Sequence, residues 1–506
     1  MLSRGPGAAS VVTTAVYLTK SRYTAGLQCL RRLWLNVFEP KEWEESEFGS
    51  VEDVGLDIGL SARLLFPGGI LIEETPWEHA KAVARTAALM AERSVPAIFE
   101  AAFEHSGVRI RVDVLERRPR GYWGMCEVKS SGEVKEHHFD DVAIQVHVLR
   151  GAGVRLSAVD VLHVNKNYVL GQKGISWAKF FRRVDVKTEV KRRLLGIEAR
   201  IKQQRVCLSQ AKAPKVEPES HCHTPVSCEH WESCTASKPT DWVFHMPHFS
   251  VARRGELKAL GIESISAIPD DFRLSPRQTV IRDVTRNGAP YVAADLSQRL
   301  RGFGPPAFYL DFEAFLPAVP LYPGTQPYQT IPFQWSLHHV DAGVVVSHRE
   351  FLADAEADPR RRFAETLVSA LKGSKLPIIV YSSYEQTRLA ELAAHFPDCA
   401  KPLRGIIRRL ADLLPVVRSG IYHPSFDFSA SIKSAAPALC PEVTYKDLDV
   451  ADGGAASTAF WLMASGRADP TTSTRLRKSL LAYCQRDTWA MVRLHEALIR
   501  LARNMS

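Results

Sequence analysis

Asp113, Glu127 and Lys129 have the residue types and the spacing that metal-dependent hydrolysis needs. They lie in two segments that predict neighbouring strands, and because residues two apart in a strand share a face, Glu127 and Lys129 project together. Two carboxylates can hold Mg²⁺ or Mn²⁺, while a lysine can position water and offset charge on a phosphate. Glu100, before the first strand, is a further metal-ligand candidate, and Gln145, on the following helix, is a supporting one. The alternative is a solvated surface pair.

A second set of acids lies in the C-terminal part of the chain. Asp311 and Glu313 are two apart at the end of an apolar segment that predicts a strand, so both face one side. Glu385 falls where a predicted strand gives way to a helix, and Tyr483 and Asp487 are four apart, hence on one helical face. Four carboxylates can hold two metal ions for phosphodiester hydrolysis, and the tyrosine can orient the attacking water. An acidic strand end that faces water is the alternative.

Cysteines form the third set. Cys222, Cys228 and Cys234 are spaced by six residues each, and Cys29 lies far upstream in a basic, helix-like stretch. Four thiolates suit an iron–sulfur cluster or Zn²⁺, and buried inert cysteines are the alternative. A mixed Cys/His zinc site also stays open because three histidines lie in the same segment: His221, His223 and His230.

The composition limits the classes of protein to consider. With 506 residues, 45% hydrophobic and 24% charged, the chain is typical of a soluble globular protein with two or three domains. It lacks an apolar run of about 18 residues and a secretion-type start, so we expect a cytoplasmic protein without a membrane partner. The net charge of +9 favours nucleic acid as a partner. Nine cysteines are too few for a disulfide scaffold.

The elements that must position these residues follow from periodicity. In the N-terminal part we predict helices over 21–38, 77–93 and 141–150 and strands over 108–115, 122–129 and 156–164. In the C-terminal part we predict strands over 308–312, 333–338, 344–351 and 376–381 and helices over 359–371, 384–395 and 473–503. The fold class is therefore α/β, with a mixed C-terminal sheet covered by helices. The predicted domains are 1–239, a small helical connector over 240–304, and 305–506.

One cysteine before a predicted strand pair and three after it resembles the RecB-type, iron–sulfur-containing exonucleases. These include a CRISPR-associated member and the nuclease subunit of the AddAB end-processing machine. The resemblance implies a PD-(D/E)XK core in which Asp113, Glu127 and Lys129 are catalytic, with Gln145 in support. It also implies an iron–sulfur cluster, 4Fe–4S, that ties the chain ends together through Cys29, Cys222, Cys228 and Cys234.

Two positions depart from that family. Its upstream histidine would fall near Gly59, where no histidine is present, and the tyrosine of its Gln-x-x-x-Tyr motif is replaced by Leu149. The first departure removes a metal ligand, so the first set is expected to hold metal more loosely.

The order Asp-x-Glu, strand-end acid, Tyr-x-x-x-Asp resembles the DEDD exonucleases of the RNase H-like superfamily, in the variant with a tyrosine. Glu385 stands where that family has Asp. Segments 315–320, 327–338 and 431–433 resemble a bacterial family of uncharacterised function that is defined by this C-terminal domain, and with the N-terminal half the resemblance covers nearly the whole chain.

These observations together predict a metal-dependent nuclease that processes nucleic-acid ends, with DNA favoured over RNA. Since no P-loop is present, any helicase must be a separate partner. The main alternative is a nucleic-acid-binding or assembly protein that is stabilised by bound metal and in which one or both sites are inactive. A zinc-stabilised protein–protein adaptor is another alternative. Phosphates are expected to contact Arg31, Arg32, Arg109 and Arg111. Five aromatic residues could stack on bases or lie in the core: Trp34, Tyr122, Trp123, Tyr328 and Trp335.

Overall fold

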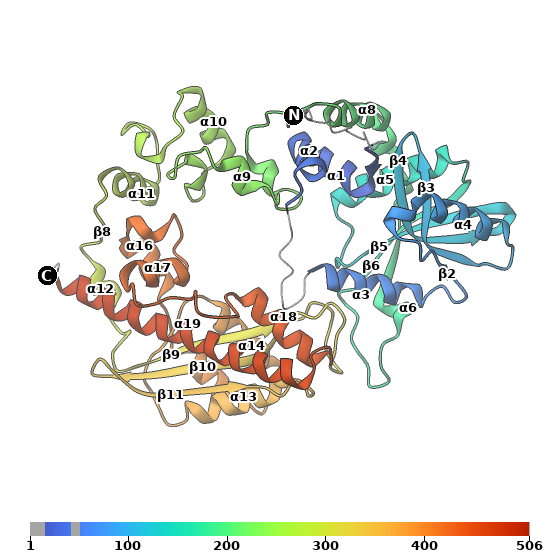
Figure 1. The fold of residues 1–506 in the computed structure, drawn as a ribbon. Coiled ribbons are helices and arrows are strands. Elements are labelled where there is room, and N and C mark those ends of the chain that lie inside the picture. The colour runs from blue at the N-terminus through green and yellow to red at the C-terminus, as the bar shows by residue number, and fades with distance from the viewer. Residues whose placement is uncertain (1–15, 42–50, 505–506) are drawn as a thin grey trace, which may run out of the picture. The chain divides into compact units, whose positions relative to one another are not determined.

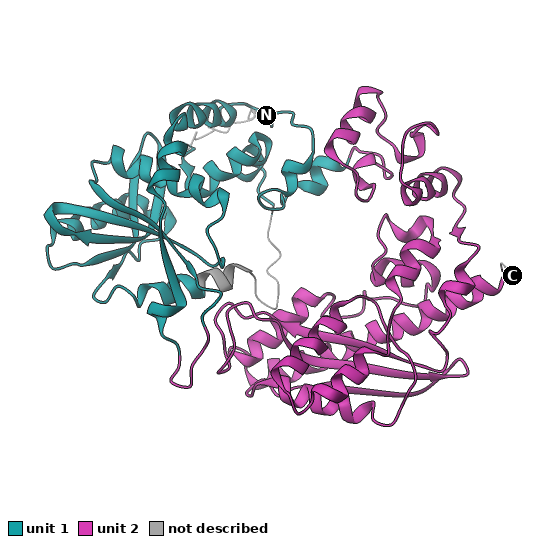
Figure 2. Ribbon diagram, turned by 180° about the vertical axis from the view of Figure 1, so that it is seen from behind, with its two compact units in different colours: residues 1–44, 51–168, 175–236 teal, residues 45–50, 169–174, 237–506 magenta. Residues whose placement is uncertain are grey.

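The computed structural model of the chain describes residues 16–41 and 51–504. These residues fall into two compact units, which Figure 2 colours separately. The first unit comprises 16–41, 51–168 and 175–236, and the second comprises 169–174 and 237–504. Residues 240–304 thus group with the C-terminal unit, and the three-part division stays a prediction. Within the described ranges, no helix is both long and apolar enough to span a membrane.

A mixed sheet forms the centre of the first unit (Figure 1). Its strands are β1 (Leu18–Thr19), β2 (Ile70–Leu71), β3 (Ala97–His105), β4 (Val108–Arg118), β5 (Tyr122–Lys129), β6 (Leu156–Val164) and β7 (Phe181–Asp185). The order across the sheet is β2-β3-β4-β5-β6-β7, and β1 pairs with the start of β4. The β3–β4 and β4–β5 pairs are antiparallel, whereas β5 and β6 are parallel.

Helices surround this sheet, and α5 packs on β3 and β4 as well as on α1 and α7. Apolar side chains of the sheet and of α5 form one continuous core. The helices, with 3-10 helices marked η, are α1 (Lys20–Gln28), α2 (Leu30–Phe38), α3 (Val51–Arg63), η1 (Pro76–Glu78), α4 (His79–Ala91), η2 (Pro119–Gly121), α5 (Glu136–Gly151), α6 (Trp177–Phe180), α7 (Lys187–Leu194), α8 (Ile197–Leu208), η3 (Ser220–His223) and α9 (Trp231–Thr235).

A second mixed sheet organises the C-terminal unit, in the order β11-β10-β9-β12-β13. Its strands are β9 (Ala307–Phe315), β10 (Ile331–Asp341), β11 (Val344–Leu352), β12 (Ile378–Val380) and β13 (Leu410–Asp412). A separate two-stranded ladder joins β8 (Tyr291–Val292) and β14 (Ile421–Tyr422). The first three strands of the larger sheet are antiparallel, and β12 and β13 then add in parallel.

The second unit also contains helices, of which α13, α18 and α19 pack on β9 or β10. They are η4 (Val243–His245), α10 (Val251–Ala259), η5 (Ile265–Ala267), α11 (Pro276–Asn287), α12 (Leu296–Arg299), α13 (Pro359–Ala370), α14 (Tyr384–His395), α15 (Ala400–Ile407), α16 (Leu414–Gly420), η6 (Pro424–Phe426), α17 (Ile432–Leu439), α18 (Gly453–Ala464) and α19 (Pro470–Asn504). In Figure 1, the long helix α19 runs along β9 and β10, on which it packs.

Alternation along β9 gives its two faces different roles. Phe308, Leu310 and Phe312 enter the core that is shared with α13, α14 and α15. Asp311 and Glu313 therefore face the opposite side, toward α19. The apolar residues hold the strand in place while the acids stay clear of that core.

The predicted α/β class with a mixed C-terminal sheet is confirmed. The predicted bounds of β5, β6 and α14 match the observed ones. The sequence did not predict β3, so Glu100 precedes β4 as expected but lies within a strand of its own. One placement was wrong. Glu313 does not end its strand, because β9 continues to Phe315, which pairs with Ile331.

Candidate functional site

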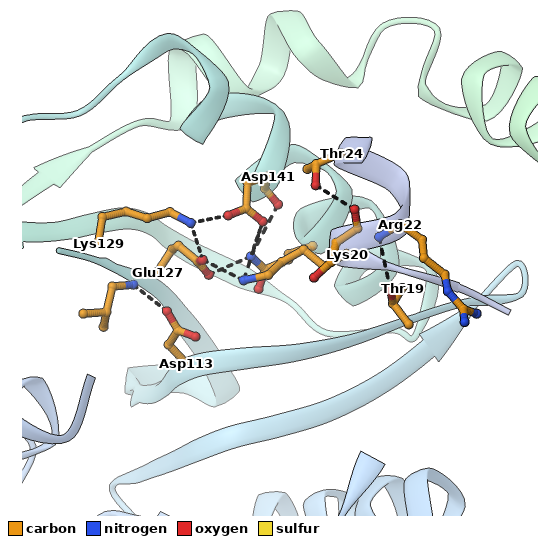
Figure 3. Close-up of polar contacts among 11 residues, drawn as sticks. Thr19, Lys20, Arg22, Thr24, Asp113, Glu127, Lys129 and Asp141 are labelled. Atoms are coloured by element: carbon orange, nitrogen blue, oxygen red, sulfur yellow. Dashed lines mark hydrogen bonds and ion pairs between the residues drawn. The ribbon is translucent and has the colours of Figure 1, made fainter. Parts of the chain in front are cut away.

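The first acidic cluster gathers side chains from β4, β5 and α5 (Figure 3). Val128 N donates to Asp113 Oδ2 at 2.7 Å, which ties Asp113 to the strand that carries Glu127. Gln145 Nε2 donates to Glu127 Oε2 at 2.7 Å, while the other amide atom of Gln145, Oε1, is buried without a hydrogen-bond partner among the described residues. The structure thus brings Asp113, Glu127, Lys129 and Gln145 together.

Two lysines bridge the carboxylates of this cluster. Lys129 Nζ lies 2.8 Å from Glu127 Oε1 and also contacts Asp141 on α5. Lys20, the first residue of α1, places its Nζ 2.7 Å from Glu127 Oε1 and 3.6 Å from Asp141 Oδ1. Neither Lys20 nor Asp141 was predicted from the sequence as a site residue. The only local signal for Lys20 was its position next to Thr19, whose side chain caps the helix.

The lysines determine which acid of the cluster is ionised. Burial raises the pKa of Asp113 to about 7, and the negative charge of Glu127 adds to that rise. Burial acts in the same direction on Glu127, but Lys129 and Lys20 overcome it and hold the pKa of Glu127 below its usual range. The cluster thus contains three carboxylates and two ammonium groups. Both ammonium groups contact Glu127 and already neutralise it.

A cleft of about 290 Å³ opens onto this cluster and is lined by Gly59, Arg63, Glu100 and Asp113, among others. Glu100 adopts a left-handed backbone (φ 55°), and its Oε1 lies 3.5 Å from Arg63 Nη2. Gly59 stands where a histidine was expected, and a Cβ added there would meet nothing within 4 Å. Glu100 therefore lines the site, and position 59 is open toward it.

Leu149 is fully buried in the core of the first unit, one helical turn beyond Gln145. A tyrosine at this position would have to fit into that apolar core. Leucine at this position therefore fits the apolar core, and Gln145 reaches Glu127 without a tyrosine there.

The four cysteines identified in the sequence line one small cavity in the first unit: Cys29, Cys222, Cys228 and Cys234. Cys29 interrupts the predicted 21–38 helix with an extended backbone (φ −160°, ψ 124°), so α1 and α2 are separate helices. Cys228 N donates to Cys222 O at 2.7 Å, which closes the loop that carries both residues. All four thiols are free.

Two of the neighbouring histidines have other contacts. His230 Nε2 lies 2.5 Å from Asn36 Oδ1, and the ring of His223 lies 4.4 Å from that of Trp231. His221 Nε2 is 3.6 Å from Cys222 Sγ. Among the residues that the structure describes, no three of the cysteine sulfurs lie within 4.8 Å of one another. In the same described ranges, the only three potential metal-ligand atoms that do so belong to Asp311, Glu313 and Cys484.

Arg31 and Arg32 belong to this cysteine site. Arg31 Nε donates to Cys234 Sγ at 3.3 Å, and Arg32 Nη2 pairs with Glu229 Oε2 at 2.8 Å. Their positive charge is therefore directed at a sulfur and at a carboxylate. Their expected phosphate contacts are a prediction that these interactions leave untested.

The second acidic cluster lies between β9, α14 and α19. Glu313 is buried, and its carboxylate makes no hydrogen bond or ion pair with another described residue. Tyr445 OH donates to Asp487 Oδ1 at 2.7 Å, and Ser382 Oγ donates to Glu385 Oε2 at 3.4 Å. Buried carboxylates without compensating cations are costly, so this arrangement favours bound cations.

Burial and mutual repulsion together raise the pKa values of the acids in this cluster. Burial, followed by the charge of Asp487, raises the pKa of Asp311 and of Glu313 well above the ordinary range. Burial raises the pKa of Glu385 to about 7. The charge of Lys433 opposes the shift at Glu313. Hard cations with oxygen ligands fit this donor set.

Lys433 also positions the tyrosine of the cluster. Its Nζ donates to Tyr483 OH at 2.9 Å and to Ala451 O at 2.6 Å. Burial raises the pKa of Tyr483, so its hydroxyl stays protonated. Tyr445 and Cys484 were not predicted from the sequence as site residues. The Sγ of Cys484 lies 3.7 Å from Asp311 Oδ2. Cys484 is adjacent to Tyr483, which was the available signal, whereas Tyr445 lies in a segment without regular structure.

Most of the predicted base-stacking residues have structural roles. Trp34, Trp123 and Trp335 are buried, and Trp34 Nε1 donates to Gln210 O at 3.0 Å. Tyr122 is partly exposed, and Arg155 lies over its ring. The most exposed large aromatic side chain among the described residues is instead Trp77.

One family model matches part of the chain. A family model described as "Domain of unknown function (DUF2779)" matches residues 308–431, a span that includes Asp311, Glu313 and Glu385. No curated protein matches the chain.

Proposed function

We propose that the chain is a metal-dependent nuclease that hydrolyses phosphodiester bonds and processes DNA ends. In this proposal the C-terminal unit is an RNase H-like, DEDD-type exonuclease domain, and the N-terminal unit is a RecB-type PD-(D/E)XK domain. The observation that carries the proposal is the second acidic cluster, in which four converging carboxylates are opposed by one lysine.

Asp311, Glu313, Glu385 and Asp487 would hold Mg²⁺ or Mn²⁺. When bound, such ions activate a water and stabilise the leaving oxygen. The Tyr483 hydroxyl stays protonated and is fixed by Lys433. It can therefore donate a hydrogen bond that orients the attacking water. Tyr445 fixes the orientation of Asp487 through its own hydrogen bond.

The cysteine cavity supports an iron–sulfur cluster in preference to one zinc ion. Four sulfurs around one Zn²⁺ lie about 3.8 Å apart, given zinc–sulfur bonds of about 2.3 Å and tetrahedral geometry. The four cysteines line one cavity without three sulfurs approaching within 4.8 Å of one another. That spacing is wider than one zinc ion requires, which is the reason for proposing a cluster at these cysteines. Protein purified without oxygen should be brown, and Cys228→Ser should lose the colour, whereas stoichiometric zinc without iron would contradict this part.

The second candidate is a nucleic-acid-binding or assembly protein in which one or both sites are inactive. The observation that favours it is the pair of lysines that neutralise Glu127. Protein purified without oxygen and incubated with end-labelled single- and double-stranded DNA and RNA in Mn²⁺ or Mg²⁺ separates the candidates. Shortening from the ends that depends on Asp311 supports the nuclease, and intact substrate under all conditions supports the binding protein. A helicase partner and a cytoplasmic location stay predictions.

A further inference from the structure

A groove of about 910 Å³ opens beside the first acidic cluster. Arg109, Arg111 and Asp113 line it from β4, where burial alternates from residue to residue, so the three side chains share the face that points away from the core. At the rise of a β-strand this row is roughly 13 Å long. The groove therefore passes two arginines before it reaches Asp113.

Trp77 lines the same groove and is 95% exposed. It makes no ring contact with any other described residue, yet its backbone is firmly held. Thr75 and Glu78 cap η1 reciprocally, and Arg111 Nη2 donates to Glu74 O at 2.8 Å and to Thr75 O at 3.2 Å. An indole on a fixed backbone, with its face in water, is suited to stack on a flat partner.

The positive groups of the groove are only partly neutralised. Arg22 Nη1 donates to Tyr17 O at 2.8 Å, and no carboxylate of the described residues pairs with it. Figure 3 shows Arg22 pointing away from the carboxylate cluster. Arg111 bonds only to backbone carbonyls, whereas Arg109 pairs with Glu104 at 2.9 Å and lies over the Tyr17 ring. Guanidinium groups with free donors fit phosphate oxygens.

We propose that this groove binds a single strand of nucleic acid, with a base stacked on Trp77 and phosphates on Arg22 and Arg111, and leads it to Asp113. A single strand fits because its bases are free to stack on an aromatic ring, whereas those of a duplex are stacked on one another. Only the fate of the strand at Asp113 rests on the proposed nuclease function. Binding itself requires no cleavage.

The test is fluorescence anisotropy of an end-labelled 12-nucleotide DNA strand at several salt concentrations, without added divalent metal. Trp77→Ala should weaken binding roughly tenfold, because one stacked base is lost, and should leave the salt dependence unchanged. Arg22→Gln should lower the slope of log affinity against log salt by about 0.7, the value for one phosphate contact on a single strand, whereas Arg22→Lys should restore it. A blunt duplex of the same sequence should bind more weakly than the strand.

Trp177→Ala is the matched aromatic control, because Trp177 is a half-buried tryptophan of the same unit that lies outside the groove. Equal affinities of wild type and Trp77→Ala, or tighter binding of the duplex, would overturn the proposal. Melting curves identify a variant that is misfolded, and Trp77→Phe, which keeps a ring, should then bind like wild type. Normal binding without digestion in Mn²⁺ would refute only the nuclease function, and digestion without any effect at Trp77 would refute only the groove.

Discussion

The two acidic clusters differ in where their neutralising charge comes from. In the first cluster, Lys20 and Lys129 approach Glu127 to 2.7 and 2.8 Å, so the protein supplies its own cations. In the second, Lys433 bonds to Tyr483, and the pKa values of Asp311 and Glu313 are raised by burial and by repulsion. Similar sets of carboxylates thus have different needs. We therefore propose that the second cluster takes up external cations, whereas lysines of the protein already neutralise part of the first.

The largest expected effect is on digestion. Asp311→Ala should reduce end-directed digestion at least roughly a hundredfold, because a ligand shared by the metal ions is lost. Lys129→Ala should remove only the activity that remains in that variant. Digestion of end-labelled DNA by both variants and by the double variant gives the ranking. Full activity of Asp311→Ala together with loss in Lys129→Ala would reverse the comparison.

The first cluster should gain metal affinity when a metal ligand is added and a competing lysine is removed. Gly59→His adds a ligand at a position with free space, and Lys20→Met removes an ammonium that competes for Glu127. We expect the double variant to bind Mn²⁺ roughly tenfold more tightly at this site. The measurement is Mn²⁺ titration in an Asp311→Asn background, followed by electron paramagnetic resonance. Unchanged binding would show that the lysines are not what keeps metal out.

The pH dependence of stability should report the burial of Glu385 in the second cluster. The pKa of Glu385 is about 7 in the folded protein, above its unfolded value, so below the unfolded pKa both states are protonated. As pH rises toward 7 the unfolded state loses its proton first, and stability falls by on the order of 2–3 kcal/mol in metal-free protein. Glu385→Gln should remove this loss.

Urea unfolding in EDTA at pH 5 and pH 8 measures that difference. Glu385→Gln should be more stable than wild type at pH 8 and similar to it at pH 5. Glu356→Gln, at an exposed position of the same unit, should follow wild type at both pH values. A stability gain for Glu385→Gln that is equal at both pH values would remove the electrostatic explanation.

The sequence predicted what strong local patterns encode. The alternation over 108–115 placed Asp113 on the strand beside Glu127, and helical spacing placed Tyr483 and Asp487 on one face. It did not predict β13, because Leu410–Asp412 is too short to show a period and, unlike β12, is not an apolar run. It also missed Lys20, which reaches Glu127 from 107 positions away in the chain. Such long-range contacts depend on packing, which spacing alone does not reveal.

Metal binding tests the central comparison most directly. Calorimetric titration of Mn²⁺ into metal-free protein should show binding that is lost in Asp311→Asn and kept in Asp113→Asn. That result would establish that the cluster whose acids are less neutralised by lysines is the one that takes up cations. Binding that is lost in Asp113→Asn and kept in Asp311→Asn would contradict the account.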